Sequence, residues 1–159
     1  MFRTYVLPKM EYASSVWYPY YIKDVDLIKK VQRKYTKFLP GMFEKSCRER
    51  RQLLDIRTLE ERRIHVDLIL MYKIIHRQID INFEKYFIFN LTPTTGHPFI
   101  LNLNPISRAN CHKHYFYNRV IKIWNALPEN IVMCSKLADF KNEVMCFNVE
   151  QHCIGRAFA

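Results

Sequence analysis

The chain has 159 residues, of which 49% are hydrophobic and only 3 are glycine, a composition that excludes a low-complexity or disordered protein. Its 25 Lys and Arg residues outnumber its 15 Asp and Glu residues, and the net charge of +10 favours polyanionic partners, nucleic acid before an anionic membrane surface. The longest apolar stretch, 64–75, contains charged residues and is shorter than the ~20 residues that cross a bilayer, so we expect no membrane partner.

The segment Asp24–Leu39 is the first strong helical pattern, and we expect the rest of the chain to pack around it. Its apolar residues recur at steps of three and four, the spacing of one helical face. They are Ile28, Val31, Tyr35 and Phe38. The opposite face is basic and carries Lys29, Lys30, Arg33 and Lys37, with Lys34 on its flank. Asp24 is expected to cap the start, and Pro40 to end the helix.

Two Ser/Thr-x-x-Glu patterns, Ser46–Glu49 and Thr58–Glu61, predict capping boxes that open the next two helices. The first helix should be short, to about Leu54, and the second should run to about His76. Because the second is apolar around most of its circumference, we place it at the centre of the domain. We expect its residues Leu68 and Met71 to be core residues.

The region 79–113 has the composition of a long irregular loop, with a turn-rich centre at 92–98. Two short strands flanking that centre are an alternative that the sequence leaves open. Two further amphipathic helices follow, one over 114–127 with Trp124 in the core, and one that we expect Ser135 to cap.

The fold class is therefore mainly α, a multi-helix bundle of about five helices with one long irregular loop. The expected regions are a helical region at 1–78, the loop or linker at 79–113, a C-terminal helical pair at 114–148 and a frayed tail at 149–159.

The acidic residues give no catalytic pattern. Catalysis by paired carboxylates needs two acids that converge on a metal or a water. The pairs Asp24/Asp26 and Glu60/Glu61 both lie where a helix is expected to start, and there negative charge offsets the helix dipole. We therefore expect no catalytic residue and no enzyme activity in this chain.

The cysteines predict neither a disulfide framework nor a zinc site. Their number is odd, their spacing is irregular and no secretory signal precedes them, which favours reduced thiols and an intracellular protein, with nucleus or cytoplasm open. They are Cys47, Cys111, Cys134, Cys146 and Cys153. The pairs Cys111-His112 and His152-Cys153 have ligand chemistry without a Cys-x2-Cys pair, so we expect no metal and no cofactor.

The basic residues are the strongest functional signal. They form three clusters: Lys29, Lys30, Arg33, Lys34 and Lys37; Arg48, Arg50 and Arg51; and Arg62, Arg63 and Lys73. A charge run is commonly no more than a solvated face. Here the excess has one sign and is interleaved with tyrosines, which favours sequence-independent contact with nucleic-acid phosphates.

Four phrases follow one another along nearly the whole chain. They are VLPKMEYASSVW at 6–17; DLIKKVQRK at 26–34 leading to Pro40-Gly41; LEERR at 59–63 with YKI at 72–74; and FxxRVxxxWNxLP at 116–128 with LxxFK at 137–141. Together they resemble the C-terminal part of non-LTR retrotransposon reverse transcriptases of the jockey-like type. Lys29 stands where that family often has Glu.

The resemblance implies a region that follows the polymerase palm, namely the thumb and a helical extension, with 1–78 as the thumb-like part. In the family the thumb grips the template–primer duplex. The palm's Asp-Asp pair does not occur in this sequence, so the resemblance implies a non-catalytic fragment of an RNA-directed DNA polymerase. Its expected partners are template–primer nucleic acid and the upstream palm. The expected nucleic-acid-binding residues are Lys29, Lys30, Arg33, Lys34, Lys37, Arg62 and Arg63.

Two other hypotheses stay open from the sequence. One is an α-helical protein-interaction domain whose aromatic N-terminal segment, with Trp17 and Tyr20, docks on the missing palm. The other is a pseudogene product without a selected role. Salt-sensitive binding to any duplex distinguishes the nucleic-acid hypothesis from the first of these, which predicts association without nucleic-acid affinity.

Overall fold

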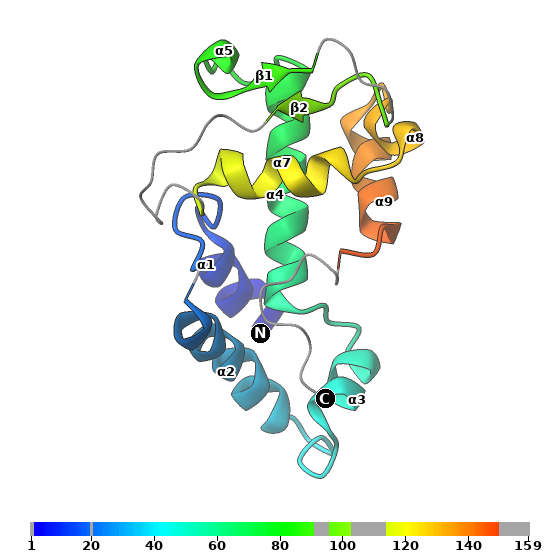
Figure 1. Cartoon of the computed structure of the whole chain (residues 1–159). Helices are drawn as coiled ribbons and strands as arrows, with labels where there is room; N and C mark the ends of the chain where they lie inside the picture. Colours follow the sequence, from blue (N-terminus) through cyan, green and yellow to red (C-terminus); the bar gives the residue numbers. More distant parts are fainter. Residues whose placement is uncertain (1, 20, 91–95, 103–113, 150–159) are drawn as a thin grey trace. The chain divides into compact units, whose positions relative to one another are not determined.

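The computed structural model describes residues 2–19, 21–90, 96–102 and 114–149 (Figure 1). The described chain is mainly helical, as predicted, with one small two-stranded sheet. It divides into two compact units, with the border between Arg63 and Ile64; unit 1 takes the residues before the border, and unit 2 the residues from Ile64 to Val149. The expected regional borders at 78, 113 and 148 remain predictions, and most of the expected frayed tail lies outside the described residues.

Unit 1 contains one long helix, α2, and several short helices. Its elements are η1 (Phe2–Val6), α1 (Leu7–Glu11), α2 (Ile22–Lys37), α3 (Cys47–Leu53) and the start of α4 (Leu59–Ile75). Pro8 lies in the first turn of α1, where its missing N–H costs no hydrogen bond. The apolar core of this unit is small: Leu7, Ile56 and Leu59 are buried, and half-buried residues such as Ile28 and Tyr35 pack against them.

The predicted apolar face of α2 is wrong in part. Ile28 and Tyr35 are half-buried, but Val31 is 44% exposed and Phe38, just beyond the helix, is 76% exposed. The buried residues are instead Val25, Gln32 and Thr36, which lie on one helical face because they are seven and four residues apart. The helix also begins earlier than predicted.

The packed side of α2 can bury polar side chains because these side chains are hydrogen-bonded. Gln32 Nε2 donates to the Arg57 carbonyl oxygen at 2.9 Å, and the Thr36 hydroxyl donates to the Gln32 carbonyl oxygen at 2.9 Å. Buried polar groups that are hydrogen-bonded avoid the cost of desolvation. Arg50 of α3 also turns inward, where its Nε donates to Thr36 Oγ1 at 3.4 Å.

Of the four N-terminal helix caps predicted from the sequence, two are confirmed and two are wrong. Ser46 and Glu49 form the predicted capping box, and the two hydrogen bonds lower the pKa of Glu49. Thr58 and Glu61 exchange the same pair of hydrogen bonds at the start of α4. The other two predicted caps are wrong. Tyr21 occupies the N-cap of α2 in place of Asp24, and Lys136 occupies that of α9 in place of Ser135; neither side chain caps its helix with a hydrogen bond.

Unit 2 has a large aromatic and aliphatic core. Its elements after α4 are α5 (Phe83–Tyr86), β1 (Ile88–Phe89), β2 (Leu101–Asn102), α7 (Phe116–Asn125), α8 (Glu129–Val132) and α9 (Leu137–Cys146). Leu68, Met71 and Trp124, the three predicted core residues, are all fully buried. Tyr72 of α4 stacks on Phe140 of α9 with ring centroids 4.3 Å apart, and its hydroxyl donates to the Cys134 carbonyl oxygen.

Helix α7 is joined to both α4 and the sheet. Figure 1 draws α7, in yellow, across α4, and a bidentate ion pair between Arg119 and Asp67 links these helices, with Nε–Oδ2 at 2.8 Å. The Asn125 side chain exchanges two hydrogen bonds with the backbone of Leu101 in β2. Strands β1 and β2 pair antiparallel, with Ile88 opposite Asn102, so the alternative of two short strands is confirmed.

Candidate nucleic-acid interface

The seven basic residues expected to bind nucleic acid fall into two groups. Four of them are exposed on α2, and we call these four the basic face. The basic face consists of Lys30, Arg33, Lys34 and Lys37. The other three, Lys29, Arg62 and Arg63, make contacts inside unit 1.

Lys29 lies on the packed side of α2, four residues after Val25 and seven before Thr36. Its Nζ is 2.5 Å from Oε2 of Glu60, and the side chains of this pair are only 16% and 5% exposed. The lysine charge is therefore matched by a carboxylate of its own unit. We exclude Lys29 from the candidate interface.

Arg62 and Arg63 hold the N-terminal helices against the start of α4. The Arg62 guanidinium donates to both carboxylate oxygens of Glu11, and this bidentate contact raises the pKa of Arg62. Arg63 is 2% exposed; it donates to the Met10 carbonyl oxygen, and its guanidinium carbon lies 4.4 Å from the centre of the Trp17 ring. Both charges serve packing within unit 1, so we exclude these two residues as well.

The basic face follows from helix geometry. Lys30, Lys34 and Lys37 are four and three residues apart, so their side chains are neighbours on the helix surface, and Arg33 adjoins them. Within the described residues, none of these four side chains forms an ion pair with a carboxylate. Lys37 Nζ lies 4.5 Å from the centre of the Phe43 ring, a cation–π contact that leaves its charge uncompensated.

Sequence reasoning missed Lys23, which belongs beside the basic face. It is exposed and lies seven residues before Lys30, hence on the same side of α2. The seven-residue spacing between Lys23 and Lys30 could have identified it, but the helix was predicted to start at Asp24, which left Lys23 out. From Lys23 to Lys37 the helix rises about 21 Å, the axial length of about six phosphates along one strand of B-DNA.

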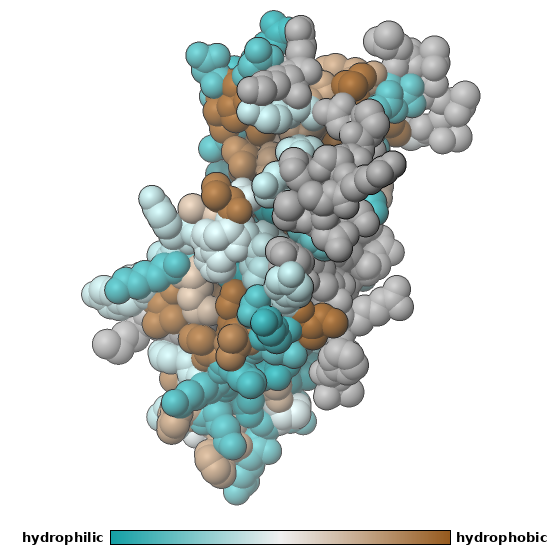
Figure 2. Space-filling view, turned by 60° about the vertical axis from the view of Figure 1, so that its left-hand side comes forward, coloured by the Kyte–Doolittle hydropathy of each residue, from teal (hydrophilic) through white to brown (hydrophobic). Residues whose placement is uncertain are grey.

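The second and third basic clusters predicted from the sequence also contain residues that are wholly or partly buried. In the second cluster Arg48 is exposed, Arg51 is half-buried and Arg50 is buried, where it donates to the Lys45 carbonyl oxygen. Lys73 of the third cluster is half-buried in unit 2. Hydrophilic residues dominate the lower part of Figure 2, at the height where Figure 1 draws α2 and α3, and hydrophobic residues interrupt them.

An exposed apolar stripe lies next to the basic face. Leu27, Val31 and Phe38 are 58%, 44% and 76% exposed, and their spacing of four and seven residues puts them on one side of the helix. Trp17, expected to dock on a partner, is 42% exposed and lies beside Arg63. Tyr20, the other residue of that expectation, lies outside the described residues.

The described residues offer no cluster of three or more His, Cys, Asp or Glu side chains that could hold a metal ion. Cys47, Cys134 and Cys146 are free thiols, and burial raises the pKa of Cys134. Cys111, His112, His152 and Cys153, the residues with ligand chemistry for which no metal was expected, lie outside the described residues. None of the described helices combines the length and the apolar character that crossing a membrane requires.

No protein-family model, no curated protein and no solved structure matches this chain.

Proposed function

We propose that the chain is a non-catalytic C-terminal fragment of a retrotransposon reverse transcriptase, and that it binds template–primer nucleic acid through backbone phosphates. The observation that carries this proposal is the basic face, four exposed cations on one side of α2 with no carboxylate partner in the described chain. The order and spacing of the four phrases in the sequence support the assignment to the retrotransposon family.

The proposed contact is electrostatic and independent of sequence. Each phosphate that a lysine or arginine neutralises releases condensed counterions, so the affinity falls steeply with salt. The side chains of the basic face lie along one helix and can meet successive phosphates of a strand. Such contacts position a duplex without reading its bases. The face adds no chemistry of its own, so we expect no primer extension by the purified chain.

The test compares two variants that lose the same charge. In the first, Lys30, Arg33 and Lys37 are all replaced by Gln; in the second, the exposed Lys122, Lys136 and Lys141 of unit 2 are replaced by Gln. Glutamine has nearly the helix propensity of lysine and arginine, so both variants should keep their fold. Binding to labelled duplexes of two unrelated sequences is measured by fluorescence anisotropy between about 50 and 200 mM salt.

We expect the wild-type chain to bind both duplexes alike, with log affinity falling linearly with log salt. The α2 variant should lose affinity for both sequences and flatten the slope by about two to three units, at ~0.9 per phosphate contact. The unit 2 variant should keep the wild-type slope. A folded α2 variant with an unchanged slope would refute the proposal.

A second candidate function, docking on the palm of the parent enzyme, is favoured by the exposed apolar stripe Leu27, Val31 and Phe38. An apolar surface of this kind is typical of a protein contact. The isolated chain should then self-associate through it. Light scattering over a range of protein concentrations distinguishes the two functions, because Leu27→Gln with Phe38→Gln should abolish apolar association and leave a phosphate contact almost unchanged.

A further inference from the structure

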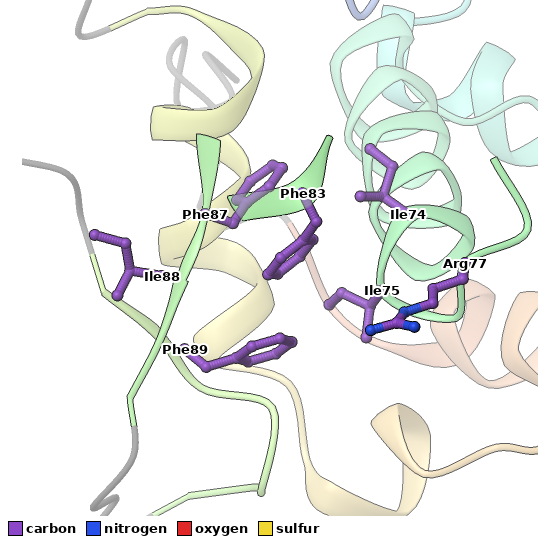
Figure 3. A pocket seen from close by; sticks show the side chains of 7 residues that line it. All are labelled: Ile74, Ile75, Arg77, Phe83, Phe87, Ile88 and Phe89. Carbon is purple, nitrogen blue, oxygen red and sulfur yellow. The ribbon is translucent and has the colours of Figure 1, made fainter. Parts of the chain in front are cut away.

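A pocket of about 450 Å³ lies in unit 2, between the end of α4 and the segment that runs from α5 into β1. Figure 3 shows its lining: aliphatic side chains at the end of α4 on one side, and aromatic side chains of the following segment on the other. The lining residues are Ile74, Ile75, Arg77, Phe83, Phe87, Ile88 and Phe89. A pocket of this size and apolar character is typical of a small-molecule site.

The aromatic wall is held in place by contacts among its own rings. Phe83 stacks on Phe87 with ring centroids 5.2 Å apart and on Phe89 with centroids 4.7 Å apart. Phe87 is 4% exposed and so anchors the wall in the core, whereas Ile88 at the rim is 48% exposed. Because the rings are fixed by one another, the pocket is a formed surface and not a gap between loose side chains.

Among the described residues of this lining, Arg77 is the charged one, and its backbone conformation is unusual. It follows α4 with φ of 52°, in the left-handed region that glycine adopts without cost. The backbone N–H of Arg77 donates to the Ile74 carbonyl oxygen at 3.1 Å, and that of Gln78 donates to the Lys73 carbonyl oxygen at 2.8 Å. These two bonds form a Schellman motif, where glycine is the usual residue.

The backbone of Arg77 therefore has a conformation that L side chains rarely adopt, as that of Asp55 has at the end of α3. Figure 3 shows the Arg77 guanidinium lying beside Ile75 at the pocket, across from Phe89. Among the side chains that the structure describes, no carboxylate pairs with it. The pocket thus combines an apolar wall with a cation, Arg77, that can donate two parallel hydrogen bonds to a carboxylate.

We propose that this pocket binds an amphiphilic monocarboxylate of the fatty-acid type, with the apolar chain against the three phenylalanines and the carboxylate on Arg77. This function goes beyond nucleic-acid binding and does not depend on it. Apolar burial supplies the affinity, and the guanidinium selects an anion over a neutral molecule of the same shape.

The test uses the whole chain with 13C-labelled isoleucine methyl groups, titrated with decanoate and, in parallel, with 1-decanol. Decanoate should shift the methyl signals of Ile74, Ile75 and Ile88 in a saturable way and leave those of buried Ile121 and Ile131 in place. Decanol should bind about tenfold more weakly, since it lacks the charge-assisted hydrogen bonds.

The variant Arg77→Gly separates a ligand role from a structural one. Glycine relieves the left-handed backbone, so the melting temperature should stay the same or rise, while the affinity for decanoate should fall about tenfold, to that of decanol. Equal binding of decanoate and decanol, shifts spread evenly over the isoleucines, or decanoate affinity unchanged in Arg77→Gly would each overturn the proposal. So would the absence of saturable shifts in the wild-type chain.

Discussion

The two units use different chemistry to hold their helices together. Unit 2 buries large apolar side chains, among them Trp124, Tyr72 and Phe140, which are all fully inaccessible to solvent. Unit 1 buries only a small apolar cluster and relies on paired charges and hydrogen bonds, such as the ion pair of Lys29 with Glu60. At the same time it leaves Leu27 and Phe38 exposed.

This difference shows which basic residues are exposed to a partner. In unit 1 the inward-facing cations have carboxylates, carbonyl oxygens or an aromatic ring beside them, and these contacts contribute to the fold. The cations on the outer side of α2 have no such carboxylate within the described residues. A net charge of +10 therefore overstates the charge that is exposed to a partner, and position on α2 identifies four of the exposed cations.

The largest expected effect is in unit 2. Trp124→Ala removes a fully buried side chain whose Nε1 donates to the Phe99 carbonyl oxygen at 3.0 Å. Truncation of a buried tryptophan typically costs about 3–5 kcal/mol, because it loses the transfer energy and leaves a cavity. Urea unfolding followed by circular dichroism measures the loss. In the same variant Trp17 fluorescence reports on unit 1, and a loss below about 1 kcal/mol would mean that unit 2 is not organised around Trp124.

A smaller loss of stability is expected when the ion pair between Lys29 and Glu60 in unit 1 is broken. Lys29→Met removes the ammonium group from beside the buried carboxylate of Glu60, at a cost of about 3 kcal/mol in the free energy of unfolding. Adding Glu60→Leu should recover most of that loss, since the buried negative charge is also removed.

The matched control for this variant is the neighbouring residue on the other side of the helix. Lys30→Met should change stability by no more than about 0.5 kcal/mol, because Lys30 is exposed. Equal effects of the Lys29 and Lys30 variants in urea unfolding would remove the distinction between the packed and the basic side of α2.

The smallest expected effect is on the pH dependence of stability. The residue responsible is His76, which lies in unit 2. Burial lowers the pKa of His76 from its ordinary value of 6.5, with a hydrogen bond to the Val132 backbone opposing the shift. The neutral ring is therefore favoured by the fold. Its contribution to stability is present above pH 6.5 and is lost as the pH falls through the lower pKa of the folded state.

His76→Phe keeps an aromatic ring to stack on Tyr72, whose ring centroid lies 4.0 Å from that of His76. We expect the variant to flatten the decline of stability below pH 6.5, as measured by urea unfolding at a series of pH values. If the variant shows the same decline as the wild-type chain, another group causes it.

The sequence predicted the fold where local signals decide the structure. The capping boxes of Ser46 and Thr58 need only residues three apart, and both are present. In unit 2 the apolar periodicity correctly placed Leu68 and Trp124 in the core. These patterns are reliable because burial of apolar area dominates there.

The apolar face of α2 that hydrophobic periodicity predicted is wrong in part, for a physical reason. Gln32 and Thr36 are buried because their partners compensate them, and the partner of Gln32 is the Arg57 carbonyl oxygen, 25 residues away in the sequence. Hydropathy describes a side chain without its partners, so it assigned Val31 to the core and left Lys29 on the outside. The exposed lysines could be predicted from their spacing, but the internal use of Arg62 and Arg63 could not.

The most direct test of the basic face is a lysine-acetylation footprint of the wild-type chain, with the rate at each lysine measured by mass spectrometry, with and without saturating duplex. We expect Lys30, Lys34 and Lys37 to react quickly alone and several-fold more slowly with duplex. Lys29, paired with Glu60, should react slowly in both conditions. Lys122 and Lys141, exposed in unit 2, should react quickly in both. Protection of the unit 2 lysines to the same extent as those of α2, or no protection of α2 at saturation, would contradict the account.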